Sequence, residues 1–423
     1  MGTTISFPVI FSPRAGFFYA LAFLTMIAAG LAMPRILSFL PAVIGLVGVT
    51  WLRVKHGAFP AFDKTLGAFF AVIVVWGVIS SYWAMDTAYS AERAMKIAGI
   101  LIPSLALLAA SRSMPSDTLY KERLPVIAAF ICILAGAVLF FEFYSKFLIT
   151  RSVIGMKIED MPENMSNGFV LNRSTVLLVV ALIPVTYLVW TSGLAKKIKY
   201  LCIGALYAIT GACLCVADSQ TAQIAALFAV LMVFFPSHRK KARMILLGVV
   251  LALMTGAPFF IKPVYIGLLP SLQEASVNNL GSWDKFLRRA SVPHRLEVWN
   301  FAAEKIGERP LFGWGVDSMR FLKSDHVMEN MRTDTVLHPH NAVLQIWLEF
   351  GAFGIAIAMG LVVFIFRRID AMKPLEQRYA ALLFIVLLSI LSTGYGLWQT
   401  WLLGMLNAIT AMNVMAVRLN SRT

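Results

Sequence analysis

The chain has 423 residues, of which 59% are hydrophobic and only 14% are charged, whereas a soluble globular domain carries about 25% charged residues. This composition excludes an ordinary soluble enzyme and places the protein among the integral membrane proteins. The formal net charge of +15 does not predict nucleic-acid binding. The Lys and Arg residues lie in short clusters between apolar runs, where they determine membrane orientation.

Twelve apolar runs have about the length, roughly 17 to 25 residues, that an α-helix needs to cross a bilayer. They cover residues 15–33, 36–52, 66–84, 95–111, 124–144, 168–190, 199–217, 221–236, 243–262, 342–366, 378–396 and 399–417. The first run is long enough to span the membrane, so we interpret it as a helix and not as a cleaved signal. The sequence therefore predicts an all-α polytopic membrane protein with about 12 transmembrane helices.

The distribution of Lys and Arg predicts the orientation of these helices. With the N-terminus inside, the inner loops and tails hold 20 Lys and Arg residues and the short outer loops hold 6. Because positive residues are retained on the cytoplasmic side, we expect both termini to be cytoplasmic. Residues 1–262 then form helices 1 to 9, residues 263–341 form a large outer loop carrying short helices, and residues 342–423 form helices 10 to 12 and a cytoplasmic tail.

Cysteine usage indicates no metal or disulfide chemistry. All four cysteines lie inside apolar runs and none belongs to a CxxC or Cys/His cluster: Cys132, Cys202, Cys213 and Cys215.

Arg173 stands near the outer end of the sixth predicted helix, with no carboxylate close to it in sequence. An ionisable group beside a membrane span is costly and needs a reason. The guanidinium either extends to the membrane interface or forms an anion site that faces the interior of the helix bundle. The neighbouring Asn172 favours the second interpretation.

The short outer turn before the eighth helix carries four polar residues, Asp218-Ser219-Gln220-Thr221. Asp218 or Ser219 is suited to cap the eighth helix. The same helix N-terminus could instead present its free backbone N–H groups to an anion.

In the large outer loop, a helix is predicted from Pro293 to Ile306, bounded by Gly307 and Pro310. Arg295 and Trp299 are four residues apart and share one face of it. A guanidinium suits phosphate oxygens, and an aromatic plane suits a sugar face or a prenyl chain. The alternative is an amphipathic helix that lies on the membrane surface.

Two of the six histidines, His338 and His340, fall within three residues at the start of the tenth helix, followed by Asn341. Histidine is suited to accept a proton near neutral pH. The alternatives are metal ligation, which the lack of a Cys or carboxylate at ligand spacing disfavours, and a helix cap with incidental histidines.

Arg173, Gln220, Arg295 and His340 come from four distant segments, yet the predicted topology brings all of them to the outer membrane interface. A cationic pocket beside a base is suited to a transferase that uses a membrane-anchored diphosphate.

His340-Asn341, nine further residues and then Gly351-Ala-Phe-Gly354 resemble the signature of the O-antigen ligase family. Arg295-x-x-x-Trp299 and the segment of residues 310–315, Pro-Leu-Phe-Gly-Trp-Gly, resemble the core that this family shares with O-antigen polymerases. One departure concerns the turn before the eighth helix, where Gln220 stands in place of the arginine usual in the family. We expect Arg173 to compensate for it.

The resemblance implies a metal-independent glycosyltransferase without a cofactor and with a GT-C-like helical fold. It would act at the periplasmic face of the bacterial inner membrane, among membrane lipids, in lipopolysaccharide biosynthesis. There it would move a glycan from undecaprenyl diphosphate to lipid A-core. His340 would be the general base and Arg295 a diphosphate-binding arginine. The expected substrate-binding residues are Arg173, Ser219, Gln220, Trp299, His338 and Asn341.

Within the superfamily, a protein glycosyltransferase that acts on pilin-like acceptors is one alternative. Two further alternatives stay open. One is an O-antigen or exopolysaccharide polymerase of the same superfamily, in which the topology and the arginines would be similar. The other is a polysaccharide transporter or flippase, for which twelve helices are equally natural. We expect no carboxylate inside the membrane for ion coupling, and we find no paired Gly/Pro-interrupted helices, which favours the transferase.

Overall fold

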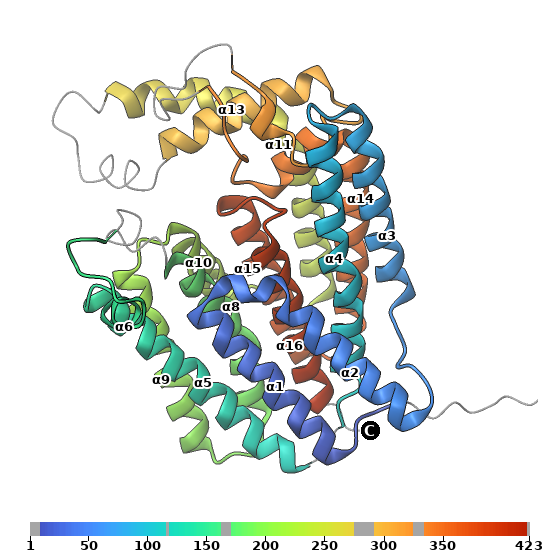
Figure 1. Ribbon diagram of the computed structural model, residues 1–423, viewed down its shortest axis with the longest axis vertical. Coiled ribbons are helices and arrows are strands. Elements are labelled where there is room, and N and C mark those ends of the chain that lie inside the picture. The colour runs from blue at the N-terminus through green and yellow to red at the C-terminus, as the bar shows by residue number, and fades with distance from the viewer. Residues whose placement is uncertain (1–8, 116–117, 162–170, 275–291, 325–333, 421–423) are drawn as a thin grey trace, which may run out of the picture.

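The computed structural model describes residues 9–115, 118–161, 171–274, 292–324 and 334–420. Every regular element in these ranges is a helix (Figure 1). The α-helices are α1 (Pro13–Ala32), α2 (Leu40–His56), α3 (Lys64–Ser80), α4 (Thr87–Arg112), α5 (Thr118–Tyr144), α6 (Leu148–Ile154), α8 (Asn172–Thr191), α9 (Lys196–Val216), α10 (Gln220–Phe234), α11 (Lys240–Glu274), α13 (Val292–Glu308), α14 (Ala342–Asp370), α15 (Pro374–Thr393) and α16 (Thr400–Asn420). Short 3₁₀ helices are η1 (Pro34–Ser38), η2 (Ser81–Trp83) and η4 (Met319–Phe321).

Each predicted apolar run coincides with one of these helices. Ten helices of the described ranges are long and apolar enough to cross a membrane. The helices of the other two runs are shorter, with 17 residues in α2 and 15 residues in α10. The protein is thus an all-helical, multi-pass membrane protein. Helix α11 continues to Glu274, which is beyond the expected end of the ninth span at residue 262.

Helix α8 forms the centre of the bundle. It is surrounded by α1, α5, α9, α10, α15 and α16. Its residues are buried without interruption from Ser174 to Val189, which is typical of a helix that is apolar on all sides. Helices α3, α4 and α14 lie side by side at the edge of the bundle, and α13 crosses its upper end (Figure 1).

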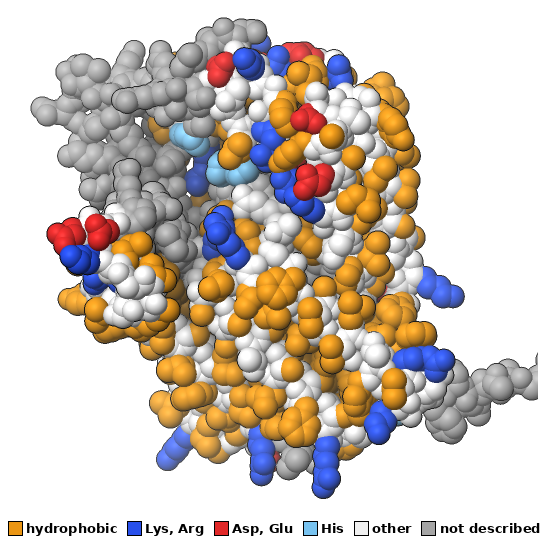
Figure 2. All heavy atoms as spheres, in the orientation of Figure 1, with side chains coloured by type: hydrophobic (Ala, Val, Ile, Leu, Met, Phe, Trp, Pro, Cys, Tyr) orange, Lys and Arg blue, Asp and Glu red, His pale blue; other side chains and the backbone are white. Residues whose placement is uncertain are grey.

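The two ends of the described chain meet at one end of the bundle. The backbone N–H of Phe11 donates to Ser113 O at 2.9 Å, and Arg418 donates to the carbonyl of the next residue, Met114, at 3.3 Å. Figure 2 shows Lys and Arg side chains along this lower rim and also in the upper half, where most visible Asp and Glu lie. The cytoplasmic location of this end stays a prediction from the sequence.

Helix α14 is broken at Gly351, whose φ of 63° and ψ of −157° are not helical. The break frees backbone groups that must find other partners in an apolar environment. The loop of residues 310–315 supplies them through four hydrogen bonds. These are Trp314 N to Leu348 O (2.9 Å), Gly315 N to Glu349 O (2.9 Å), Ala352 N to Pro310 O (2.8 Å) and Phe353 N to Leu311 O (3.2 Å).

Glycine is required on both sides of this contact. A Cβ atom on Gly351 would lie 2.4 Å from the Leu311 backbone, and one on Gly313 would lie 2.4 Å from the Glu349 backbone. Both glycines also have positive φ, which costs other residues more. Residues 310–315 and Gly351 therefore form one interlocked structure that holds the outer half of α14 in place.

Candidate active site

The histidine segment lies at the N-terminus of α14. Asn341 is the N-cap, and its side-chain oxygen accepts from Val343 N (3.0 Å) and Leu344 N (3.2 Å). His340, which precedes it, has a left-handed φ of 53°, an uncommon conformation in which His is enriched. The cap fixes the direction in which the chain leaves His340. The oxygen of Asn341, expected to contact substrate, is thus engaged by its own helix.

The ring of His340 is oriented by a carbonyl group from another helix. Its Nδ1 lies 2.5 Å from the oxygen of Gly394, just beyond the end of α15. Because a carbonyl only accepts, Nδ1 carries the proton and Nε2 keeps a lone pair. Burial lowers the pKa of His340, and the nearby charge of Arg295 lowers it further. His340 is therefore a neutral imidazole in which Nε2 is the acceptor.

The ring of His338 packs 4.3 Å from that of His340, centroid to centroid. The amide nitrogen of Gln399 lies 3.2 Å from His338 Nε2, and the Gln399 oxygen accepts from Trp401 Nε1 at 2.7 Å. Burial, with the charge of Arg320 and the neighbouring His340, lowers the pKa of His338 to about 3. His338 is therefore neutral as well.

Helix α13 supports this segment from above. Trp299 Nε1 donates to the carbonyl of Pro339, between the two histidines, at 2.8 Å. The ring of His294 lies 6.2 Å from that of His340. The charge of Arg295 lowers the pKa of both His294 and His340, so the guanidinium is close to both rings.

The predicted helix from Pro293 to Ile306 is present as α13 (Val292–Glu308), and it is not a helix lying free on a membrane surface. About half of its residues are buried, and it packs against α11 and α14. This packing favours the interpretation in which the helix belongs to the site over that of a surface amphipathic helix. The buried face carries the residues that support the histidines.

Arg173 lies in the first turn of the buried central helix α8, so it does not extend from a lipid-facing span. Its guanidinium lies over the ring of Trp401 at 5.1 Å. The neighbouring Asn172 donates to Asp218 O at 3.1 Å. Arg35, in η1, is close enough to repel it electrostatically. The geometry favours the interpretation in which Arg173 faces the interior of the bundle.

The turn before α10 lies beside Arg173 and joins the same region. Ser219 is buried at the N-cap position, but its side chain makes no capping hydrogen bond, so the predicted cap by Ser219 is not formed. Gln220 is the first, half-buried residue of α10. Thr221 donates to Thr393 O at 3.3 Å, which attaches this turn to the end of α15.

Sequence reasoning missed the connection between α15 and α16. The two last apolar runs, 378–396 and 399–417, left only two residues between them, whereas the helices leave residues 394–399 outside. Gly394 and Gly396, two glycines in three residues, were the available turn signal. Gly396 is needed because a Cβ atom there would lie 2.7 Å from the His338 ring.

Residues 203–359 match the family model described as O-antigen ligase. The match extends from α9 into α14 and includes α13 and the two histidines. This part of the chain is therefore similar to the O-antigen ligase family.

Three relatives of this chain come from rickettsiae, and each is described provisionally as a polysaccharide ligase. The protein of Rickettsia typhi (strain Wilmington) is 29% identical over 240 residues, 55% of each chain. The protein of Rickettsia prowazekii (strain Madrid E) is 38% identical over 125 residues, 28% of this chain and 31% of the relative. That of Rickettsia felis (strain URRWXCal2) is 25% identical over 361 residues, 83% of this chain and 82% of the relative. The matched part of the chain thus spans about half of the Rickettsia typhi protein and about a third of the Rickettsia prowazekii protein.

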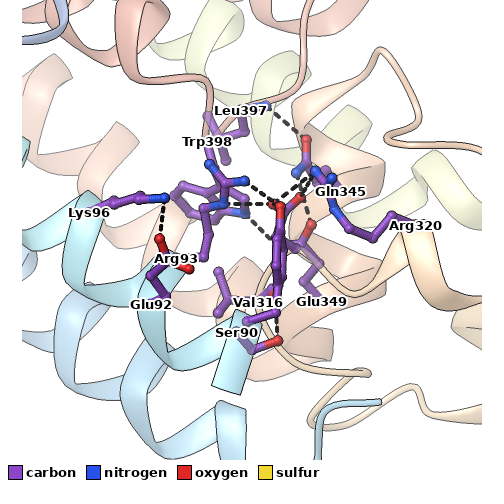
Figure 3. Close-up of polar contacts among 12 residues, drawn as sticks. Ser90, Glu92, Arg93, Lys96, Val316, Arg320, Gln345, Glu349, Leu397 and Trp398 are labelled. Carbon is purple, nitrogen blue, oxygen red and sulfur yellow. Dashed lines mark hydrogen bonds and ion pairs between the residues drawn. The ribbon is translucent and has the colours of Figure 1, made fainter. Parts of the chain in front are cut away.

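The family signature Gly351 stands beside a fully buried carboxylate, Glu349 (Figure 3). Glu349 accepts hydrogen bonds from Trp398 Nε1 and from Gln345 Nε2, the latter at 2.8 Å, while the Gln345 oxygen accepts from Leu397 N at 2.8 Å. The apolar helix α14 thus does carry a buried carboxylate, whereas the expectation concerned a carboxylate for ion coupling, which stays untested. Through these bonds, Glu349 anchors residues 394–399 to α14.

Asp317 belongs to a second polar network, and its partners Arg93 and Arg320 are labelled in Figure 3. It forms ion pairs with Arg93 at 2.7 Å and with Arg320 at 3.0 Å, and accepts from the Tyr89 hydroxyl at 3.1 Å. These partners join α4 to the loop that leads to η4. Asp317 is thus committed to structural contacts.

Within the described ranges, no three His, Cys, Asp or Glu side chains are grouped so that they could hold a metal ion. The metal independence implied by the family signature stays a prediction.

Proposed function

We propose that this protein is an O-antigen ligase, which moves a glycan from undecaprenyl diphosphate to lipid A-core at the periplasmic face of the bacterial inner membrane. One observation carries the proposal. The Nδ1–H of His340 is held by Gly394 O, so its Nε2 remains a proton acceptor beside the cationic Arg295. A base next to a guanidinium is the arrangement that activation of a hydroxyl and departure of a diphosphate need.

The proposed step is a direct displacement. The acceptor hydroxyl gives its proton to His340 Nε2 while its oxygen bonds to the anomeric carbon of the glycan. The bond between that carbon and the phosphate oxygen breaks, and its electron pair leaves with the diphosphate. Arg295 and Arg173 neutralise the negative charge that develops there.

Arg173 supplies the positive charge of the arginine that is usual in the family at the position of Gln220. Its position over Trp401 supports this assignment, as does the bond from the neighbouring Asn172 to the backbone of Asp218 in the turn before α10. Arg173→Ala should abolish transfer, whereas Arg173→Lys should keep part of it because the charge remains. The matched control is Arg53→Ala, in the last turn of α2. Full activity of Arg173→Ala would contradict the assignment.

The test of the function is transfer by purified protein, with a glycan on undecaprenyl diphosphate as donor and lipid A-core as acceptor, with and without EDTA. We expect glycosylated lipid A-core in both conditions. Loss of product with EDTA would contradict metal independence. A lengthened glycan on the lipid carrier would instead identify a polymerase, and absence of both products would favour a transporter.

A further inference from the structure

The two neighbouring histidines have opposite hydrogen-bonding assignments, and this inference rests on the function proposed above. His340 donates from Nδ1 to Gly394 O and presents a lone pair at Nε2. For His338 the assignment follows from a chain of three side chains that runs through Gln399 to Trp401.

The indole N–H of Trp401 can only donate, so its 2.7 Å partner on Gln399 must be the amide oxygen. The other end of the Gln399 amide is then the NH₂ group, which faces His338 Nε2 at 3.2 Å. An NH₂ group donates, so Nε2 of His338 must be the acceptor. The single proton of neutral His338 is therefore on Nδ1.

The Nδ1 atom of His338 is buried and forms no hydrogen bond of ordinary geometry with a described residue, although the ring also interacts with the backbone of His338 itself. The Cγ–Cδ2 edge of its ring faces Gly396, so the Nδ1–Cε1 edge points away from the loop of residues 394–399. The charged and titratable groups that act on the ring are His340 and Arg320. A buried N–H donor without a hydrogen bond of ordinary geometry is costly and is suited to a ligand atom.

We propose that Gln399 is a positioning residue that holds His338 as the Nδ1–H tautomer, so that His338 donates to a substrate oxygen beside the hydroxyl that His340 deprotonates. The site thus presents one acceptor and one donor side by side. The substrate class is one with an anionic or carbonyl-like oxygen next to the reacting carbon, which the diphosphate of the proposed donor provides.

The variant Gln399→Glu tests this directly. A carboxylate still accepts from Trp401, but it cannot donate to His338. Neutral His338 then carries its proton on Nε2 and loses the Nδ1–H, whereas protonated His338 keeps both. The carboxylate also raises the pKa of His338.

Transfer by Gln399→Glu should therefore fall, relative to wild type, as the pH rises. We expect it to be within about threefold of wild type near pH 5.5 and roughly tenfold or more lower near pH 8. The control is the same change at Gln223, which is exposed and bonds backbone carbonyls of α9 and its C-terminus. If the transfer rate of Gln399→Glu relative to wild type did not change with pH, the proposal would be overturned. A purely structural defect would lower the rate without depending on the protonation of His338.

A second readout does not depend on activity. In protein labelled with ¹⁵N-histidine, the His338 signals, assigned by their loss in His338→Asn, should show an Nδ1–H tautomer in wild type at pH 8 and an Nε2–H tautomer in Gln399→Glu. An Nε2–H tautomer in wild type would overturn the proposal. If wild type transferred nothing to lipid A-core, the proposed function would fail, and the tautomer would still decide the assignment of Gln399.

Discussion

Burial determines the charge of the three histidines at the candidate site. It lowers the pKa of His294 and His340, and it lowers that of His338 to about 3. Their mutual repulsion and the charges of Arg295 and Arg320 act in the same direction. All three rings are therefore neutral at neutral pH. His340 stays unprotonated, and so able to act as a base, down to a pH below the usual histidine pKa of about 6.5.

These shifts predict how stability depends on pH. The unfolded chain binds protons at its histidines as the pH falls below about 6.5, and the folded chain does so only at lower pH. The histidines therefore leave the free energy of unfolding at its full value above about pH 6.5 and lower it as the pH falls below that value. We expect a lower thermal unfolding midpoint in detergent near pH 5 than near pH 7.5, and a smaller difference in His338→Gln. Equal pH dependence in the two proteins would contradict burial of a neutral His338.

At the scale of elements, the break in α14 connects the sequence signature to the structure. The conformation of Gly351 is nearly restricted to glycine, and the loop of residues 310–315 fills the space that a side chain would need. Gly351→Ala should therefore lower the free energy of unfolding by roughly 1–3 kcal/mol or more. Thermal unfolding in detergent measures it.

The matched control is Gly248→Ala in α11, where a Cβ atom meets nothing within 4 Å. This change should leave the midpoint unchanged or raise it slightly, because Ala favours a helix by about 0.5–1 kcal/mol. If the two variants unfolded alike, the interlock between Gly351 and residues 310–315 would not contribute to stability.

The helices could be predicted because each depends on its own segment. Apolar runs give the membrane helices, and the bounding Pro293 and Gly307 give α13. The partners of the site side chains could not be predicted, because they are distant in sequence. Gly394 is 54 residues from His340, and Trp398 is 49 from Glu349. The connection formed by residues 394–399 could not be recognised, because its apolar residues continue the adjacent apolar runs.

At the scale of the whole molecule, the bundle has one end that carries both described chain ends and another that carries the candidate site. We predict that the first end is cytoplasmic. Green fluorescent protein fused after residue 420 should fluoresce, and alkaline phosphatase at the same point should be inactive. Alkaline phosphatase inserted after Glu308 should be active. The reverse pattern would place His340 on the cytoplasmic side.

The measurement that tests the central claim most directly is transfer of glycan to lipid A-core in a single turnover by His340→Ala, beside wild type and the control His56→Ala. His56 is exposed at the end of α2. We expect product from wild type and from His56→Ala, and a rate at least roughly a hundredfold lower from correctly folded His340→Ala. A rate for His340→Ala within a few-fold of wild type would contradict the assignment of His340 as the base.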